Sequence, residues 1–150
     1  MINVERLSGS PLVLIVDDTL PVRLMISRIL SQAGYRVATA ADGVSAVALI
    51  EGRGPPGLVV TDLRMPLMRG EAFARWLVRH YPRTPLLFMS GFGPEDDEQL
   101  PAPLLRKPFT PEALLGAVGR ALTRNDPKAA PGAGMSAGSE PTRQAGDRRL

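Results

Sequence analysis

Two adjacent carboxylates close an apolar run near the start of the chain. The run Leu12–Val16 is aliphatic throughout, and Asp17 and Asp18 follow it directly. Because two like charges held side by side disfavour each other's ionised form, such a pair is costly unless something compensates it. Either this segment simply ends in water, or a positive group is held at this point of the fold.

Three further polar side chains occupy the same kind of place, each at the end of a short apolar segment. They are Asp62 after residues 58–61, Ser90 after residues 85–89, and Lys107 after Leu104–Arg106. In a parallel sheet, the carboxyl ends of all strands lie along one edge, where ligands bind. If the first and third strands are neighbours, the carboxylates of Asp17, Asp18 and Asp62 meet there.

A cluster of three carboxylates suits a hard divalent cation with oxygen ligands. Mg²⁺ binds carboxylate oxygens, keeps several waters, and so leaves coordination sites for phosphoryl oxygens. In such a site Asp62 can act as a nucleophile toward a phosphoryl group, while the cation and Lys107 neutralise the transferring oxygens. Ser90 can donate a hydrogen bond to the product.

Amphipathic segments separate the short apolar segments and predict helices between strands. The first expected helix has apolar residues at helical spacing from Val22 to Ala33, with Pro21 in its first turn and Gly34 as its stop. The others are a helix capped by Asp42 and broken by residues 52–57, a helix from Gly70, and a last helix from Thr110 with Pro111 in its first turn. A second strand is expected at residues 35–39. The fold class is therefore α/β, a five-stranded parallel sheet with helices on both faces. Residues 91–103 leave room for only a short fourth helix.

Composition narrows the function classes. The formal net charge is +3, but the arginines are scattered, and the only lysines are Lys107 and Lys128. A nucleic-acid surface would need basic residues gathered on one face. The absence of cysteine excludes disulfides, thiolate nucleophiles and cysteine zinc sites. No apolar run is long enough to span a bilayer, and no secretory signal pattern is present. We therefore expect a cytoplasmic protein without nucleic-acid or membrane partners.

The chain divides by composition into three parts. Residues 1–10 are expected to form an N-terminal extension, and residues 11–124 a single domain. Residues 125–150 are rich in Gly, Pro, Ala and Ser, which predicts a disordered tail and no output domain.

The stretches IVDD, VTDLRMPLMRG, LLFMSG and LLRKPF together resemble the receiver domain of bacterial two-component response regulators over residues 11–124. The resemblance implies a flavodoxin-like sheet of order 2-1-3-4-5 and identifies Asp62 as the phosphoacceptor. It also implies that Asp17, Asp18 and the backbone carbonyl of Arg64 bind Mg²⁺. Further implications are that Ser90 and Lys107 contact the phosphoryl group and that the Lys107–Pro108 bond is cis. The sequence is most similar to receivers of hybrid sensor histidine kinases.

The implied function is a phosphorelay module. Its donor is a phosphohistidine on a sensor histidine kinase or a histidine phosphotransfer protein, and its output is contact with a downstream protein. It is not an enzyme beyond its own phosphorylation and dephosphorylation. Leu104 departs from the pattern, because many receivers carry an aromatic residue three positions before the lysine. Arg64 places a long cation two residues beyond Asp62.

Two alternatives stay open. One is a Mg²⁺-dependent phosphatase or phosphotransferase with an aspartate nucleophile, as in the haloacid-dehalogenase group. That group uses a D-x-D pair after the first strand, which IVDDTL does not match. The other is a phosphorylation-independent pseudo-receiver. Such domains usually lack an acidic position or the lysine, and this chain has all of them.

Overall fold

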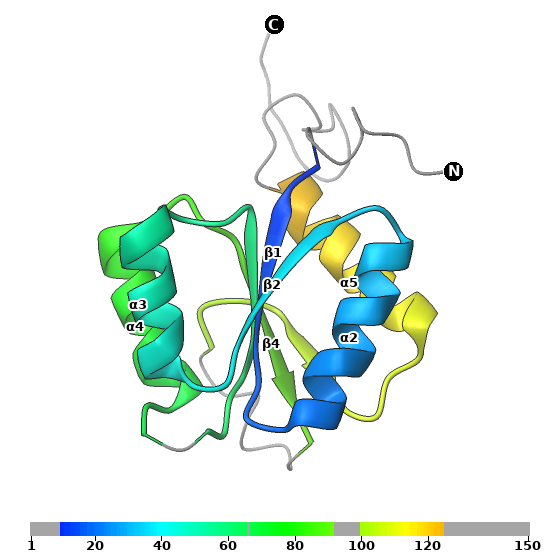
Figure 1. The fold of residues 1–150 in the computed structure, drawn as a ribbon, viewed down its shortest axis with the longest axis horizontal. Helices are drawn as coiled ribbons and strands as arrows, with labels where there is room; N and C mark the ends of the chain where they lie inside the picture. Colours follow the sequence, from blue (N-terminus) through cyan, green and yellow to red (C-terminus); the bar gives the residue numbers. More distant parts are fainter. Residues whose placement is uncertain (1–9, 66, 92–99, 125–150) are drawn as a thin grey trace, which may run out of the picture.

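The computed structural model describes residues 10–65, 67–91 and 100–124, which form a parallel sheet between two pairs of helices (Figure 1). The strand order is β2-β1-β3-β4-β5, which confirms the expected topology. In chain order, the elements are β1 (Leu12–Val16), α2 (Leu20–Gln32), β2 (Arg36–Ala40), α3 (Gly43–Arg53), β3 (Leu58–Asp62), α4 (Gly70–His80), β4 (Leu86–Ser90), β5 (Leu104–Arg106) and α5 (Pro111–Arg124).

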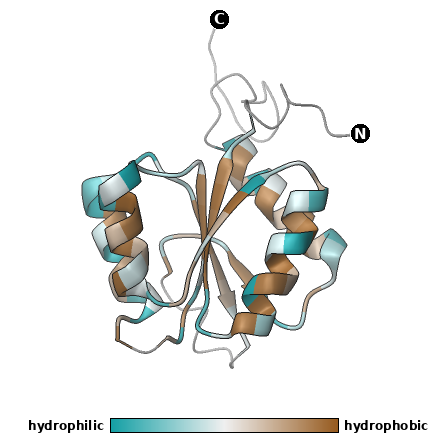
Figure 2. Ribbon diagram, in the orientation of Figure 1, coloured by the Kyte–Doolittle hydropathy of each residue, from teal (hydrophilic) through white to brown (hydrophobic). Residues whose placement is uncertain are grey.

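Both faces of the sheet are covered, which explains why its central strands are apolar without alternation. Helices α3 and α4 pack on one face, and α2 and α5 on the other (Figure 1). Successive residues of β1 point to opposite sides, so Leu14 joins the core under α3 and α4, whereas Ile15 joins the core under α2 and α5. The helices turn their hydrophobic sides to the sheet and their polar sides to solvent (Figure 2).

Local signals set the helix ends as the sequence predicts. The Asp42 carboxylate accepts a hydrogen bond from the Ser45 backbone N–H at 2.7 Å and caps α3. Thr110 Oγ1 accepts one from the Ala113 N–H at 3.0 Å at the start of α5. Gly34 follows α2 with a φ of 101°, a left-handed conformation that glycine adopts without steric cost.

The second and fourth strands each begin one residue later than expected, and β4, at Leu86–Ser90, includes Ser90. The second strand is Arg36–Ala40, one residue later than predicted, because the Tyr35 N–H donates to the Leu30 carbonyl at 3.1 Å and so still belongs to the end of α2. In α5, Leu114, Ala117, Val118 and Ala121 are buried, and the partly buried Leu115 and Leu122 pack against the same core. The expected fourth helix falls mostly on residues 92–99, outside the described residues, as do the N-terminal extension up to residue 9 and the tail.

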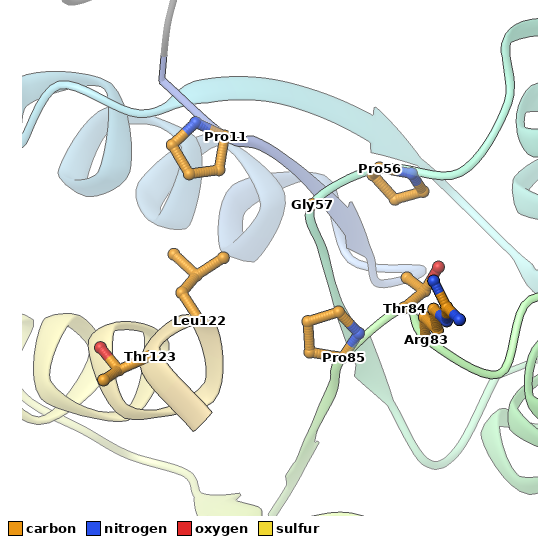
Figure 3. Close-up of a pocket in the computed structure, with 8 residues that line it drawn as sticks. All are labelled: Pro11, Pro56, Gly57, Arg83, Thr84, Pro85, Leu122 and Thr123. Carbon is orange, nitrogen blue, oxygen red and sulfur yellow. The ribbon is translucent and has the colours of Figure 1, made fainter. Parts of the chain in front are cut away.

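The amino ends of the strands surround an open hollow of about 400 Å³ (Figure 3). Three prolines that precede strands line it: Pro11 directly before β1, Pro85 directly before β4, and Pro56 two residues before β3. Leu122 of α5 lines the same hollow. None of the described helices combines the length and apolar character that a bilayer crossing requires.

Candidate functional site

The predicted acidic residues meet at the carboxyl end of the sheet. Asp17 directly follows β1, Asp62 is the last residue of β3, and these neighbouring strands pair with Val16 opposite Thr61. Carboxylate oxygens of Asp17, Asp18 and Asp62 all lie within 4.8 Å of one another. The structure therefore brings together the three side chains that strand-end spacing predicted to converge.

The three carboxylates differ in their surroundings. Asp17 is fully buried and Asp62 is 6% exposed, whereas Asp18 is exposed. The Thr19 backbone N–H donates to Asp17 Oδ1 at 2.8 Å. The Arg64 backbone N–H donates to Asp62 Oδ1 at 3.3 Å. Asp17 is thus a fixed internal anion, while Asp62 keeps an opening to the outside.

Lys107 connects the two buried carboxylates. Its Nζ donates to Asp17 Oδ2 at 2.9 Å and to Asp62 Oδ2 at 3.2 Å. The lysine follows β5 directly, and its backbone N–H donates to the Ser90 carbonyl at 2.8 Å. The Lys107–Pro108 peptide bond is cis, as the resemblance implies. One ammonium therefore stands between carboxylates from two different strands.

Burial and charge shift the pKa values of the central pair. Burial raises the pKa of Asp62 above its ordinary value, and the nearby Asp17 charge adds to this, although Lys107 and the Arg64 N–H act in the opposite direction. Burial alone would lower the pKa of Lys107, but its hydrogen bond to Asp17 and the charges of Asp62 and Asp17 raise it. The lysine is therefore held in its charged form between the two carboxylates.

Ser90 lies fully buried at the end of β4. Its strand neighbours set its place, because Asp62 pairs with Met89 and Ser90 pairs with Arg106 in the ladder. A Cβ built on the next residue, Gly91, would lie 3.7 Å from the Lys107 Cβ, so this turn runs close beside the lysine. The three residues predicted to act on a phosphoryl group thus lie on adjacent strand ends.

The sequence profile of the response regulator receiver domain matches residues 13–119. That match covers most of the chain and includes every residue of the cluster described above. This chain belongs to the response regulator receiver domain family.

Individual relatives agree with this assignment. The receiver is 38% identical over 127 residues to the sensor kinase CckA of Brucella abortus, covering 80% of this chain and 13% of that protein. It is 32% identical over 127 residues to the autoinducer 1 sensor kinase/phosphatase LuxN of Vibrio campbellii, covering 82% of this chain and 15% of that protein. The expected similarity to receivers of sensor kinases is confirmed, and the chain spans only a small part of these two relatives.

A solved structure shows the same fold. The chemotaxis response regulator CheY4 of Vibrio cholerae superposes on the receiver with a TM-score of 0.70 at 35% sequence identity. The match covers 76% of this chain and 100% of that one. The likeness includes the strand order and the helices on both faces, so the flavodoxin-like architecture is shared.

The cluster is a chemically suitable cation site. Its donors are carboxylate oxygens, the ligands that a hard cation such as Mg²⁺ prefers, and they lie close enough together to share one ion. Lys107 supplies one positive charge against three carboxylates, and this excess of acidic groups suits a cation. The Arg64 backbone N–H contacts Asp62, and the metal-binding role of its carbonyl stays a prediction.

The position that carries an aromatic residue in many receivers is occupied here by a partly buried leucine. Leu104 is the first residue of β5 and packs beside the core under α3 and α4. The loop between β3 and α4 has an unusual feature of its own, because Leu67 adopts a φ of 71° and is 82% exposed. A left-handed leucine is strained, and the sequence carries no signal for it because glycine or asparagine is expected at such positions.

One residue of the site escaped the sequence analysis. Arg23, at the end of the first turn of α2, donates from Nη1 to the backbone carbonyl of Asp17 at 2.6 Å. The helical pattern assigns this position no role, because it lies between the apolar residues that face the core. Its position six residues after Asp17, about one turn into the helix that follows the acidic pair, is the signal that could have identified it.

Proposed function

We propose that this receiver accepts a phosphoryl group on Asp62 from a phosphohistidine of a partner protein and uses the modification to change its protein contacts. The observation that carries the proposal is the convergence of Asp62, Asp17 and Lys107, which come from three different strand ends. Asp62 is the buried carboxylate that keeps some exposure to solvent, whereas Asp17 has none.

The proposed reaction is a transfer between two covalent carriers. A carboxylate oxygen of Asp62 attacks phosphorus, the bond between phosphorus and the imidazole nitrogen breaks, and the imidazole leaves with the electron pair. The product on this chain is an acyl phosphate. Asp62 attacks as a carboxylate, which has no proton to lose, so the step needs no general base.

The cofactor that we propose is Mg²⁺, held by Asp17, Asp18 and Asp62. When bound, it would neutralise oxygens of the transferring phosphoryl group, as metal ions do in other phosphoryl transfers. Lys107 holds Asp17 and Asp62 in place through its two ion pairs and adds positive charge on the side of β5. Thr19 and Lys107 orient Asp17, so its carboxylate is already placed before any cation arrives.

The proposed output is a change of surface. Phosphorylation adds nearly two negative charges and strong acceptor oxygens, which can bias a two-state element through Ser90 and Lys107. Apolar side chains next to the site favour protein partners. Leu20 is 54% exposed and Leu24 is 58% exposed, and both lie on α2 shortly after the acidic pair. We propose a histidine kinase or histidine phosphotransfer protein as donor and a protein as downstream target.

We also propose that the chain is not an enzyme toward free substrates and that it acts in the cytoplasm, where ATP charges histidine kinases. A Mg²⁺-dependent phosphatase of the haloacid-dehalogenase type is less well supported, because the second acid after β1 is adjacent to the first and not two residues away. A pseudo-receiver is less well supported, because the three acids and the lysine are present and in contact.

The test uses a radiolabelled histidine phosphotransfer protein as phosphodonor, with Mg²⁺ and with EDTA. We expect label on the wild-type chain up to one equivalent with Mg²⁺, and no label on Asp62→Asn. Sustained hydrolysis of a small phosphate ester such as p-nitrophenyl phosphate would support the phosphatase instead. Absence of label from every phosphohistidine and small acyl phosphate donor, with folded protein, would support the pseudo-receiver.

A further inference from the structure

The two adjacent acids after β1 are held in different ways. All the polar groups of Asp17 have partners: its N–H donates to the Ala40 carbonyl at 3.2 Å, and its carboxylate accepts from Thr19 and Lys107. The Asp18 carboxylate is exposed, and the described part of the chain offers it no hydrogen bond. The position of the Asp18 side chain therefore depends on the backbone that carries it.

That backbone is held by an arginine. Arg23 Nη1 donates to the Asp17 carbonyl at 2.6 Å, and this carbonyl belongs to the peptide group that joins Asp17 to Asp18. The Arg23 N–H also donates to the Thr19 carbonyl at 3.0 Å, in the first turn of α2. Since a peptide group is planar, fixing its carbonyl oxygen fixes the direction in which the Asp18 Cα leaves it.

We propose that Arg23 is a positioning residue for the metal site, and that it acts by clamping the Asp17–Asp18 peptide so that the Asp18 carboxylate is placed for the cation. This role rests on the proposed function, in which the three carboxylates hold Mg²⁺. Arg23 contributes through a backbone oxygen, as groups outside the coordination sphere commonly do when they orient metal ligands.

A purely electrostatic role for Arg23 would have the opposite consequence. A guanidinium beside a cation site repels the incoming dication, so removal of that charge alone should strengthen Mg²⁺ binding. Loss of the clamp instead allows the exposed acid to move and should weaken binding. The sign of the change in affinity therefore separates positioning from charge.

The experiment is a calorimetric titration of Mg²⁺ into the wild-type chain, Arg23→Gln, Arg23→Lys and Arg28→Gln. Arg28→Gln is the matched control, because Arg28 is exposed on the same helix and its loss changes the net charge equally. We expect Arg23→Gln to weaken binding about tenfold, the low end of the range for lost orienting partners. Arg23→Lys should fall between wild type and Arg23→Gln, and Arg28→Gln should match wild type.

Urea unfolding in EDTA establishes whether each variant is folded. If Arg23→Gln is not folded, the Mg²⁺ affinity of Arg23→Lys decides the test. Unchanged or tighter binding by folded Arg23→Gln, with Arg23→Lys like wild type, would overturn the positioning role and leave the proposed function intact. Absence of Mg²⁺ binding by the wild-type chain would overturn the proposed cofactor and this role together.

Discussion

Strands β1 and β3 lead into buried aspartates at one edge of the sheet, and both start shortly after a proline at the other edge. At the carboxyl end, Asp17 and Asp62 are buried and share the ammonium of Lys107. At the amino end, Pro11, Pro56 and Pro85 line an open hollow (Figure 3). The amino end contains few groups that need compensation, whereas the carboxyl end contains three carboxylates and a single lysine.

Proline explains how strands can start at the amino end with few unpaired backbone donors. It has no N–H, so a strand that starts after it leaves one fewer donor to satisfy. Its carbonyl still accepts ladder bonds: the Arg36 N–H donates to Pro11 at 3.3 Å and the Val59 N–H to Pro85 at 3.0 Å. We infer that phosphoryl transfer is confined to the carboxyl end of the sheet, while the amino end contributes only to stability. The predictions below test that separation.

The largest effect is expected from Gly70→Ala at the carboxyl end. A Cβ on Gly70 would overlap the Asp62 carbonyl oxygen and lie 2.8 Å from the Leu63 Cα, both backbone atoms that cannot move independently. We expect the free energy of unfolding to fall by about 3 kcal/mol, the upper range for overpacking, and phosphorylation to slow because the end of β3 shifts. Urea denaturation and a labelling time course measure the two. Gly52→Ala, with open space around its Cβ, is the control.

Lys107→Met should have the next largest effect. It leaves the fully buried Asp17 charge without its ion pair, and we expect a loss of about 2 kcal/mol, less than for a fully buried pair because the lysine side chain is 23% exposed. Mg²⁺ should restore part of this loss. The same substitution at Arg69, whose ion pair with Glu71 is exposed, should cost less than about 0.5 kcal/mol. Equal losses in the two variants would contradict the proposed contribution of Lys107.

Gly57→Ala probes the amino end. Its new Cβ would lie 2.9 Å from the Pro11 Cβ and 3.4 Å from the Leu12 carbonyl oxygen. A moderate steric conflict of this kind should lower the free energy of unfolding by about 1 kcal/mol and leave the phosphorylation rate unchanged. A slower rate at equal Mg²⁺ occupancy would mean that the two ends are coupled, and the separation would be wrong.

The smallest effect concerns the pH dependence of the metal-free protein. Burial raises the pKa of Asp62, so the folded state binds this proton more tightly than the unfolded state. The stability that Asp62 contributes is present below its pKa in the unfolded chain, near 3.8. It should decrease as the pH rises through the higher pKa of the folded state. In urea denaturation with EDTA, the free energy of unfolding of Asp62→Asn relative to that of wild type should therefore be higher at pH 7 than at pH 4. A difference that does not change with pH would contradict this.

The sequence predicted the features that depend on the pattern of apolar and polar residues. The apolar runs and their polar end residues indicated five strands, and the resemblance gave their order. That order places Asp17 next to Asp62, since β1 pairs directly with β3. Helix signals such as Asp42 and Gly34 lie where the structure uses them. These features are local, or follow from topology, and do not require side-chain coordinates.

Features that depend on side-chain reach could not be predicted in the same way. Arg23 extends back to a carbonyl at the end of β1, and only the spacing between strand and helix decides whether it can. Leu67 adopts a left-handed conformation that its residue type disfavours.

The central claim is that the carboxyl end of this sheet accepts a phosphoryl group on Asp62 with the help of a cation. The most direct measurement is peptide mapping by tandem mass spectrometry after phosphorylation by acetyl phosphate, with borohydride reduction to mark the acyl phosphate. We predict modification of Asp62 alone in Mg²⁺ and none in EDTA. Modification at another residue, or equal modification of Asp62 in EDTA, would contradict the account.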